Sequence, residues 1–320
     1  MRAMQVTEYD SPLRLCDVDK PKPSAGEVLV RVETCGMNFG DTLMIKGTYQ
    51  EKPPLPFTLG MELAGVVEAI GEGVTDLAVG QRIAAYHGYG GLAEYAALPA
   101  AICVPVPDEM SAVDAAAFLV AYGTSHVALD YKAHLAAGER LLVLGASGGV
   151  GLTAVELGKL MGAEVIACAR GAEKLEICAK AGADHLINSD TDDIRTIVKE
   201  LGGADVVYDP IGGDQFKAAL RATNPEGRIL PLGFASGEVP QIPANIVLVK
   251  NISVIGLYWG GYATVNPKVL TDSFKVLFDW YAAGKLTPHV SNVLPLEQAN
   301  EALDLLRSRK ATGKVVVQVA

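Results

Sequence analysis

Four glycines near the middle of the chain have the spacing of a turn that binds a phosphate group. They lie in the segment LGASGGVG (144–151), between an apolar run typical of a buried strand and apolar residues at helical spacing. There Gly148 lets the backbone approach an anion and Gly151 lets the helix pack closely on the strand, while the helix N-terminus offers free N–H groups. Ala146 replaces the first glycine of the usual G-x-G-x-x-G, with Gly145 just before it able to make the turn. The segment predicts a pyrophosphate site at Ala146, Ser147, Gly148, Gly149, Val150 and Gly151, and the alternative is an ordinary glycine-rich loop.

A positively charged residue after the next predicted strand indicates which dinucleotide binds. In folds that select NAD, an acidic residue about 20 positions past the glycines binds the adenosine ribose. Here the strand EVIACA (164–169) runs directly into Arg170, and Lys174 lies one turn into the following helix. A guanidinium at that place pairs with a 2′-phosphate through charge-assisted hydrogen bonds, so these two residues predict NADPH. The alternative is a solvated Arg and Lys at the start of a helix.

The composition excludes several classes of protein. The chain has 320 residues, enough for about two domains, and its net charge of -10 repels nucleic acid. No stretch approaches the ~18 apolar residues of a membrane span, and early acidic residues interrupt any signal sequence. The five cysteines are scattered, which favours reduced thiols over disulfides or structural zinc. We therefore expect a cytoplasmic protein that binds neither membranes nor nucleic acid.

The elements that must position these residues fall into two groups. The first third is rich in short strands, which suggests a partly closed antiparallel barrel, with strands at Glu27–Thr34, Ala64–Ile70, Gln81–Tyr86, Leu92–Leu98 and Ile102–Val106. Strands then alternate with helices, which predicts an α/β fold with a doubly wound parallel sheet of Rossmann type. Its strands are predicted at Leu141–Leu144, Glu164–Ala169, His185–Asn188, Asp205–Tyr208, Arg228–Leu232 and Ile252–Leu257. Helices are predicted at Ala115–Val120, Ala121–Ala133, Ala172–Ala181, Asp192–Leu201 and Asp214–Ala222.

The segment from about Tyr258 onward is too short for a second nucleotide-binding domain. It contains two predicted helices, Pro267–Ala283 and Leu296–Arg307, and a last strand, Gly313–Val319. The simplest arrangement returns this segment to the N-terminal part. The Rossmann domain (119–257) is then inserted into a catalytic domain made of residues 1–118 and 258–320.

Across essentially its whole length the chain resembles the zinc-independent quinone oxidoreductase branch of the medium-chain dehydrogenase/reductase family, with zeta-crystallin as a relative. The resemblance rests on CGMNFGDTLMIKGTY (35–49), LGMELAGVV (59–67), GGLAEYAALP (90–99), LGASGGVG, VVYDPIGG (206–213), GFASGEVP (233–240) and GKVVV near the end. It implies a GroES-like β-barrel catalytic domain around a Rossmann domain, with the active site in the cleft between them. It also implies a homodimer in which the last Rossmann strands of two subunits pair, here at Asn251–Gly256, and the alternative is a covered internal strand.

The resemblance also bears on metal binding. Zinc alcohol dehydrogenases of the superfamily bind zinc through a cysteine and a histidine, and the matching positions here are Asn38 and Met61, which supply neither ligand. Glu62 is a single carboxylate, no histidine has ligand spacing, and Cys35 is better explained as a packed thiol. We therefore expect no metal. A quinone or enone acceptor, which delocalises the incoming charge itself, fits such a site best.

Three residues of the family's active-site string are candidates for catalysis. Asn38 can orient a carbonyl oxygen through its amide, and Tyr49 is a candidate hydroxyl donor to the oxygen that gains charge. Asp41 either acts directly or only caps a helix, and Tyr49 has the alternative role of a pocket wall. Because a hydroquinone can take its proton from water, no dedicated acid is required.

Other family positions imply further contacts with the cofactor. Thr124, beside Gly123, lies where the family brings a helix past the nicotinamide, and Asp209–Gly212 follows the fourth strand where ligands bind in open sheets. Ser189 replaces a tyrosine frequent in relatives, which implies a looser 2′-phosphate pocket. The remaining candidates lie after the last two Rossmann strands: Gly233, Phe234, Ala235, Tyr258 and Trp259. For Tyr258 and Trp259 the alternative is packing in an interface.

These observations favour an NADPH:quinone reductase that transfers hydride to a quinone or a similar small electron-poor acceptor. The alternative is an NADPH-dependent reductase of activated alkenes, such as enones or enoyl thioesters, because the same architecture can deliver hydride to a β-carbon. A third hypothesis is an NADPH-binding protein without turnover, acting structurally or on RNA as some relatives do. The net charge of -10 argues against RNA.

Overall fold

The computed structural model describes all residues, 1–320, and divides into two compact units. Unit 1 contains residues 1–120 and 278–320, and unit 2 contains residues 121–277. The predicted boundary differs, because residues 258–277 lie in unit 2. None of the helices is both long and apolar enough to cross a membrane.

Packing within unit 2 explains why residues 258–277 belong there. The indole of Trp259 lies against Gly123, where an added Cβ would come within 2.8 Å of the ring, and it meets Phe274 edge to face. The hydroxyl of Ser273 lies 2.9 Å from Nδ1 of His126. These contacts bind the segment to the start of unit 2, and composition alone did not reveal them.

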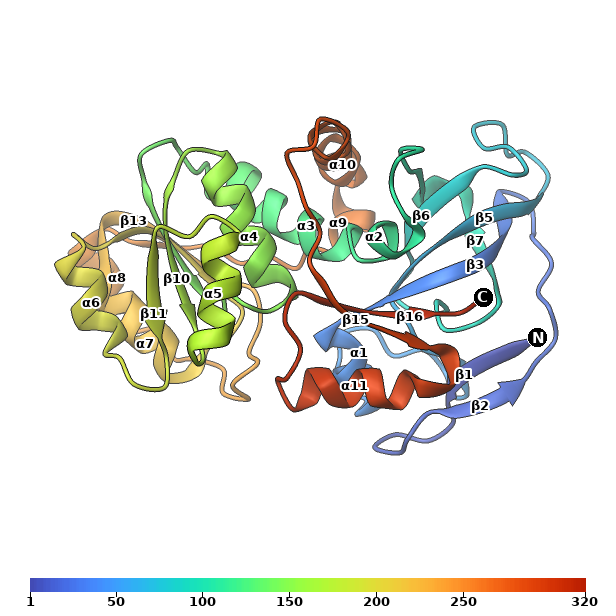
Figure 1. The fold of residues 1–320 in the computed structure, drawn as a ribbon, viewed down its shortest axis with the longest axis horizontal. Helices are drawn as coiled ribbons and strands as arrows, with labels where there is room; N and C mark the ends of the chain where they lie inside the picture. Colours follow the sequence, from blue (N-terminus) through green and yellow to red (C-terminus); the bar gives the residue numbers. More distant parts are fainter. The chain divides into compact units, whose positions relative to one another are not determined.

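Unit 1 is built from two β-sheets (Figure 1). Its strands are β1 (Arg2–Val6), β2 (Arg14–Asp17), β3 (Glu27–Met37), β4 (Phe57–Thr58), β5 (Glu62–Ile70), β6 (Arg82–Tyr86), β7 (Tyr95–Pro99), β8 (Cys103–Pro105), β15 (Val290–Pro295) and β16 (Lys314–Gln318). The smaller sheet has the order β2-β1-β4, and the larger has the order β15-β16-β3-β5-β6-β8 with β7 also paired to β3. The strand-rich character predicted for this part is confirmed, whereas its closure into a barrel stays a prediction.

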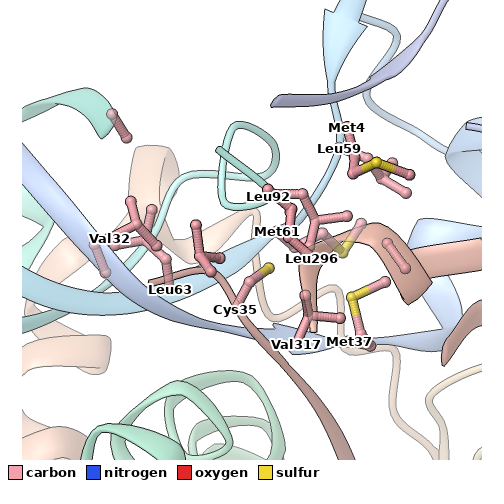
Figure 2. Close-up of a cluster of buried hydrophobic side chains, with 14 of the residues drawn as sticks. Met4, Val32, Cys35, Met37, Leu59, Met61, Leu63, Leu92, Leu296 and Val317 are labelled. Atoms are coloured by element: carbon pink, nitrogen blue, oxygen red, sulfur yellow. The ribbon is translucent and has the colours of Figure 1, made fainter. Parts of the chain in front are cut away.

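The core of unit 1 explains the apolar run in β16. This strand lies between β15 and β3, and its three consecutive valines are fully buried, as in a strand covered on both faces. Figure 2 shows Val317 of β16 in one apolar cluster with Cys35 and Met37 of β3 and with Met61. The strand β16 is therefore an interior strand of the sheet and part of the core of unit 1. The helices of this unit are α1 (Phe39–Ile45), η1 (Ala100–Ile102), α2 (Ala112–Ala116), η3 (Leu296–Gln298) and α11 (Ala299–Arg307).

Unit 2 is a parallel sheet with helices packed against it (Figure 1). Its strands are β9 (Arg140–Leu144), β10 (Glu164–Ala169), β11 (His185–Asn188), β12 (Ala204–Asp209), β13 (Thr223–Pro231) and β14 (Ser253–Val254). The strand order is β11-β10-β9-β12-β13-β14, so the chain first adds strands on one side of β9 and then, from β12, on the other side. This confirms the predicted doubly wound Rossmann topology. The helices within or entering this unit are α3 (Leu119–His126), η2 (Val127–Lys132), α4 (Gly149–Leu160), α5 (Ala172–Lys180), α6 (Ile194–Glu200), α7 (Gly213–Ala222), α8 (Ala244–Lys250), α9 (Tyr262–Val265) and α10 (Pro267–Ala282).

The structure differs from the predicted elements mainly at short or exposed segments. The last Rossmann strand was predicted as Ile252–Leu257, but β14 is only two residues long because it is an edge strand that pairs with β13 alone. The helices α1 and α8 were not predicted, since each has seven residues and neither repeats apolar residues over two helical turns. The strands β1, β2, β4 and β15 and the four-residue helix α9 were missed as well.

Candidate functional site

The glycine turn of unit 2 has the geometry of a cradle for an anion. It joins β9 to α4, and Gly145 has a φ of +60°, which permits the tight turn. A Cβ on Gly151 would lie 2.2 Å from the carbonyl oxygen of Gly145, so close packing of α4 requires glycine there, as predicted. A Cβ on Gly148 would meet only that oxygen at 3.4 Å, an ordinary contact. The protein itself therefore leaves the space beside Gly148 free, and this N-cap residue has no side chain to occupy the α4 N-terminus.

Three buried hydroxyl groups support the start of α4, and sequence reasoning missed them. Ser125 donates to the carbonyl oxygen of Val150 at 2.9 Å and lies 2.8 Å from the hydroxyl of Thr153. The hydroxyl of Tyr208, on β12, lies 2.9 Å from Ser125, and burial raises its pKa. Thr124, the predicted neighbour of the nicotinamide, is partly buried beside this network. The network connects α3, α4 and β12 behind the glycine turn.

Two of the predicted 2′-phosphate residues, Arg170 and Ser189, come together at the carboxyl ends of β10 and β11. Ala169 and Asn188 are partners in the parallel register, so Arg170 and Ser189 follow side by side, and the amide of Ser189 donates to Ala169 at 3.0 Å. The guanidinium of Arg170 lies 3.4 Å from a carboxylate oxygen of Asp190, and both side chains are half exposed. Lys174 lies partly exposed in the first turns of α5. Asp190 is a counter-charge that sequence reasoning did not single out.

The loops after β12 and β13 also lie side by side. The amide of Ala235 donates to the carbonyl oxygen of Pro210 at 3.1 Å, and the exposed ring of Phe234 lies next to Gly212. Within the first loop the buried carboxylate of Asp209 accepts from the amides at 211 and 212, and burial raises its pKa. Gly233, Phe234 and Ala235 therefore lie at the carboxyl ends of the strands, where ligands bind in such folds.

The two aromatic candidates after β14 have different environments. Trp259 is 5% exposed and packs on Gly123 and Phe274, which favours a packing role. Tyr258 is exposed and its ring lies close to Gly261. Of these two residues, Tyr258 is the one that presents its ring at the surface of unit 2.

In unit 1, four side chains form a group that we call the buried polar cluster: Asn38, Asp41, Glu62 and Lys314. The ammonium of Lys314 donates to Glu62 Oε1 at 2.7 Å, to Asn38 Oδ1 at 2.7 Å and to the carbonyl oxygen of Met37 at 2.9 Å. The Lys314 and Glu62 side chains are only 6% and 1% exposed. Sequence reasoning missed Lys314, although a lysine that directly precedes a run of valines was a signal that its charge needs a buried partner.

Asn38 is the N-cap residue of α1 and connects the members of this cluster. Its backbone amide donates to Asp41 Oδ2 at 2.7 Å, so the capping alternative considered for Asp41 is present in the structure. Its side-chain amide donates to Glu62 Oε1 at 2.9 Å and to the carbonyl oxygen of Gly36 at 3.3 Å. The other carboxylate oxygen of Glu62 accepts from the amide of Val120 at 2.9 Å.

Asp41 is fully buried, and its Oδ1 has no hydrogen-bond partner. Burial raises the pKa of Asp41 to about 7, while the hydrogen bond from Asn38 and the charge of Lys314 oppose the shift. Cys35 is also fully buried, and desolvation raises the pKa of its thiol well above the ordinary value. Cys35 is therefore an inert packed thiol rather than a thiolate.

Tyr49 and Met61 both lie close to Gly40 in α1. A Cβ on Gly40 would lie 2.7 Å from Met61 Cε and 3.3 Å from Tyr49 Cε2. Tyr49 is partly buried against the apolar core of unit 1. The structure thus brings Tyr49 next to α1, on which Asn38 and Asp41 also lie. No group of three or more His, Cys, Asp or Glu side chains is arranged to hold a metal ion.

Comparison with known proteins decides the family. Residues 24–108 match the alcohol dehydrogenase GroES-like domain, and residues 149–275 match the zinc-binding dehydrogenase domain. A quinone oxidoreductase-like protein 2 homolog from Nematostella vectensis is 41% identical over 323 residues, which cover 99% of this chain and 88% of the relative. The chain belongs to the zinc-independent quinone oxidoreductase branch of the medium-chain dehydrogenase/reductase family.

Solved structures agree with this membership of an oxidoreductase family. A mycobacterial protein complexed with NADPH has a TM-score of 0.93 and 32% identity, and the match covers 100% of both chains. The Escherichia coli quinone oxidoreductase complexed with NADPH has a TM-score of 0.92 and 28% identity, again over 100% of both chains. The resemblance inferred from the motifs is thereby confirmed, and the α/β fold with it.

Proposed function

We propose that this chain is an NADPH-dependent quinone oxidoreductase that transfers hydride without a metal. The observation that carries the proposal is which side chains lie in the buried polar cluster and next to it, where zinc relatives bind their metal. At the two positions where zinc relatives hold cysteine and histidine, this chain has Asn38 and Met61, and the ammonium of Lys314 lies 2.7 Å from Asn38. An ammonium at that distance repels a metal cation, and neither side chain is a good zinc ligand. An acceptor that stabilises negative charge itself, such as a quinone, fits these residues.

The residues of unit 2 fit NADPH. The free space beside Gly148 and the uncapped α4 N-terminus suit a pyrophosphate, and Arg170 with Lys174 and Ser189 suits a 2′-phosphate. When bound, NADPH supplies the hydride. The remaining cofactor contacts that we propose are with Thr124, Gly233, Phe234, Ala235 and Tyr258.

The residues of unit 1 bind and orient the electron acceptor. We propose that the side-chain amide of Asn38 donates a hydrogen bond to the carbonyl oxygen that gains charge, and that Tyr49 lines the pocket beside it. Asp41 acts through α1, because its carboxylate holds the backbone of Asn38 at the helix start. The final proton reaches the hydroquinone from water.

Parallel assays of NADPH oxidation test this function. The near-ultraviolet absorbance of NADPH is followed with a quinone, a simple enone and an enoyl thioester, before and after treatment with a chelator. We expect turnover with the quinone that chelation leaves unchanged. Turnover confined to the enone or thioester would favour the alkene reductase alternative, and NADPH binding without any turnover would favour a binding protein. Loss of activity on chelation would contradict the metal-free mechanism.

We also propose a homodimer formed through the edge of the unit 2 sheet. The support is that β14 pairs with β13 on one side only, and that Leu248 and Val249 of the neighbouring α8 are 75% and 76% exposed. Sedimentation of Leu248→Glu tests it, because a charge in the interface converts a dimer to a monomer. Val265→Glu, at another exposed valine of unit 2, is the matched control and should sediment like the wild type. A cytoplasmic location stays a prediction from the sequence.

A further inference from the structure

We infer that Lys314 and Glu62 are positioning residues that fix the side-chain amide of Asn38 as a hydrogen-bond donor toward the acceptor. The inference rests on the proposed function, because it gives a reason for the orientation of the residue that we place at the acceptor's carbonyl oxygen. None of the motifs quoted from the sequence pairs Glu62 with Lys314, which are 252 positions apart.

The chemistry of the three side chains leaves one orientation for the Asn38 amide. A lysine ammonium can only donate hydrogen bonds, and a carboxylate can only accept them. Asn38 therefore turns Oδ1 toward Lys314, at 2.7 Å, and Nδ2 toward Glu62, at 2.9 Å. A flipped amide would place its NH2 group against the ammonium and its oxygen against the carboxylate. Two charge-assisted hydrogen bonds would be lost, so the flipped state is strongly disfavoured.

This orientation determines what Asn38 offers to a ligand. One hydrogen of Nδ2 is used by Glu62, and the other has only the carbonyl oxygen of Gly36 at 3.3 Å, beyond the usual 2.7–3.2 Å range of such bonds. Asn38 is also partly exposed, whereas Asp41, Glu62 and Lys314 are buried. The second amide hydrogen is thus the group free to shift to a stronger acceptor. It matches the carbonyl oxygen of a quinone, and the Lys314 hydrogen bond to Oδ1 polarises the amide and strengthens the donor.

Stability of the fold does not by itself call for this ion pair. Replacing both members of a buried ion pair by uncharged groups of similar shape is often neutral or stabilising, while removing one member is costly. All three hydrogens of the Lys314 ammonium are used, by Glu62, by Asn38 and by the backbone at Met37, so the lysine has none left for a substrate. Lys314 therefore acts through Asn38.

The test uses the variant Lys314→Met/Glu62→Gln, which removes both charges and keeps an acceptor for the amide of Val120. With the quinone we expect kcat to fall about 10- to 100-fold, the range for losing hydrogen bonds to charged groups, while KM for NADPH stays within about twofold. Asn38→Ala should lose a similar factor in the wild-type background and nothing further in the double variant. Losses that multiply independently would overturn the inference.

Two controls separate positioning from a general loss of structure. Lys314→Arg, which keeps the charge, should retain more activity than Lys314→Met. Lys20→Met removes an exposed lysine paired with Glu68 in the same unit and should leave turnover unchanged. Equal activities of Lys314→Arg and Lys314→Met would contradict the inference.

A readout independent of turnover distinguishes failure of the inference from failure of the proposed function. In protein labelled with 15N at asparagine, the side-chain NH2 signal of Asn38 is identified by its absence from Asn38→Ala. We expect slow hydrogen exchange for this signal in the wild type and faster exchange in Lys314→Met/Glu62→Gln. An unchanged exchange rate would overturn the inference even if the quinone is reduced. The expected change in a protein that reduces no quinone would leave the orienting pair standing and refute the proposed function.

Discussion

The two units carry polar sites of opposite construction. In unit 2 the candidate site is made of backbone groups and half-exposed cations, from residues that are close together in sequence: the turn 145–151 and the segment 170–174. In unit 1 it is made of side chains from β5, β16 and the start of α1, with Asn38 and Lys314 separated by 276 positions. The first site, which we call the open site, presents N–H groups and cations that a negatively charged ligand can bind. In the second site, which we call the closed site, almost all charges are paired within the protein, and one N–H group of Asn38 is held in a fixed orientation.

The largest effect predicted for this comparison is that of Gly151→Val in the open site. A Cβ there would lie 2.2 Å from a backbone oxygen, so α4 must move away from β9. We expect a loss of about 3 kcal/mol or more in the free energy of unfolding, together with loss of NADPH binding. Denaturant titration and fluorescence of bound NADPH measure the two effects.

Gly148→Ala is the matched substitution in the same turn, because its Cβ would make only an ordinary contact at 3.4 Å. The unfolding midpoint should stay close to that of the wild type while NADPH binding weakens. If both variants unfolded equally early, Gly148 would serve the fold rather than a ligand.

Charge reversal at the exposed edge gives the next effect. Arg170→Glu removes the guanidinium from the proposed 2′-phosphate site and adds a repulsive carboxylate close to Asp190. We expect KM for NADPH to rise about 10- to 100-fold while KM for NADH changes little. Arg195→Glu, on an exposed position of α6, should leave both values unchanged. Equal increases for the two cofactors would refute the assignment of Arg170.

In the closed site, Asp41→Asn tests whether burial raises the pKa of the Asp41 carboxyl group. The pKa of Asp41 is about 7 in the folded protein and 3.8 in the unfolded chain. Between pH 3.8 and 7, the folded state therefore keeps a proton that the unfolded state releases. The contribution of Asp41 to stability is thus complete below pH 4 and falls by up to about 1.4 kcal/mol per pH unit toward pH 7. Unfolding titrations at pH 4.5 and 7 should show the variant gaining stability relative to the wild type. A constant difference would contradict the raised pKa.

The smallest effect is expected for Tyr49→Phe. Tyr49 packs partly buried beside α1, and water can protonate a hydroquinone, so kcat with a quinone should stay within about threefold of the wild type. Stopped-flow measurement of NADPH oxidation checks this. A loss of about 100-fold or more would make Tyr49 a general acid and give the closed site a second catalytic group.

The open site could be predicted from sequence because its physics is local. A strand, a glycine turn and a helix within one short segment restrict the backbone enough to name Gly148 and Gly151, and the parallel register places Arg170 beside Ser189. The closed site could be predicted only in part. Asn38 and Asp41 were found through the resemblance, but the partner of Glu62 is on a strand at the other end of the chain, and no spacing rule connects them. For the same reason the burial of Trp259 against Gly123 was not foreseen.

The interior place of β16 in the unit 1 sheet has a consequence for synthesis on the ribosome. Residues 121–277, which form unit 2, leave the ribosome before residues 314–318, and domains generally fold as units during synthesis. Unit 2 can therefore complete its sheet while unit 1 still lacks the strand between β15 and β3. Until that strand arrives, Glu62 has no lysine partner and the valine-lined core of unit 1 is open to water and to chaperones. The strand β16 thus brings both the missing sheet position and the missing charge.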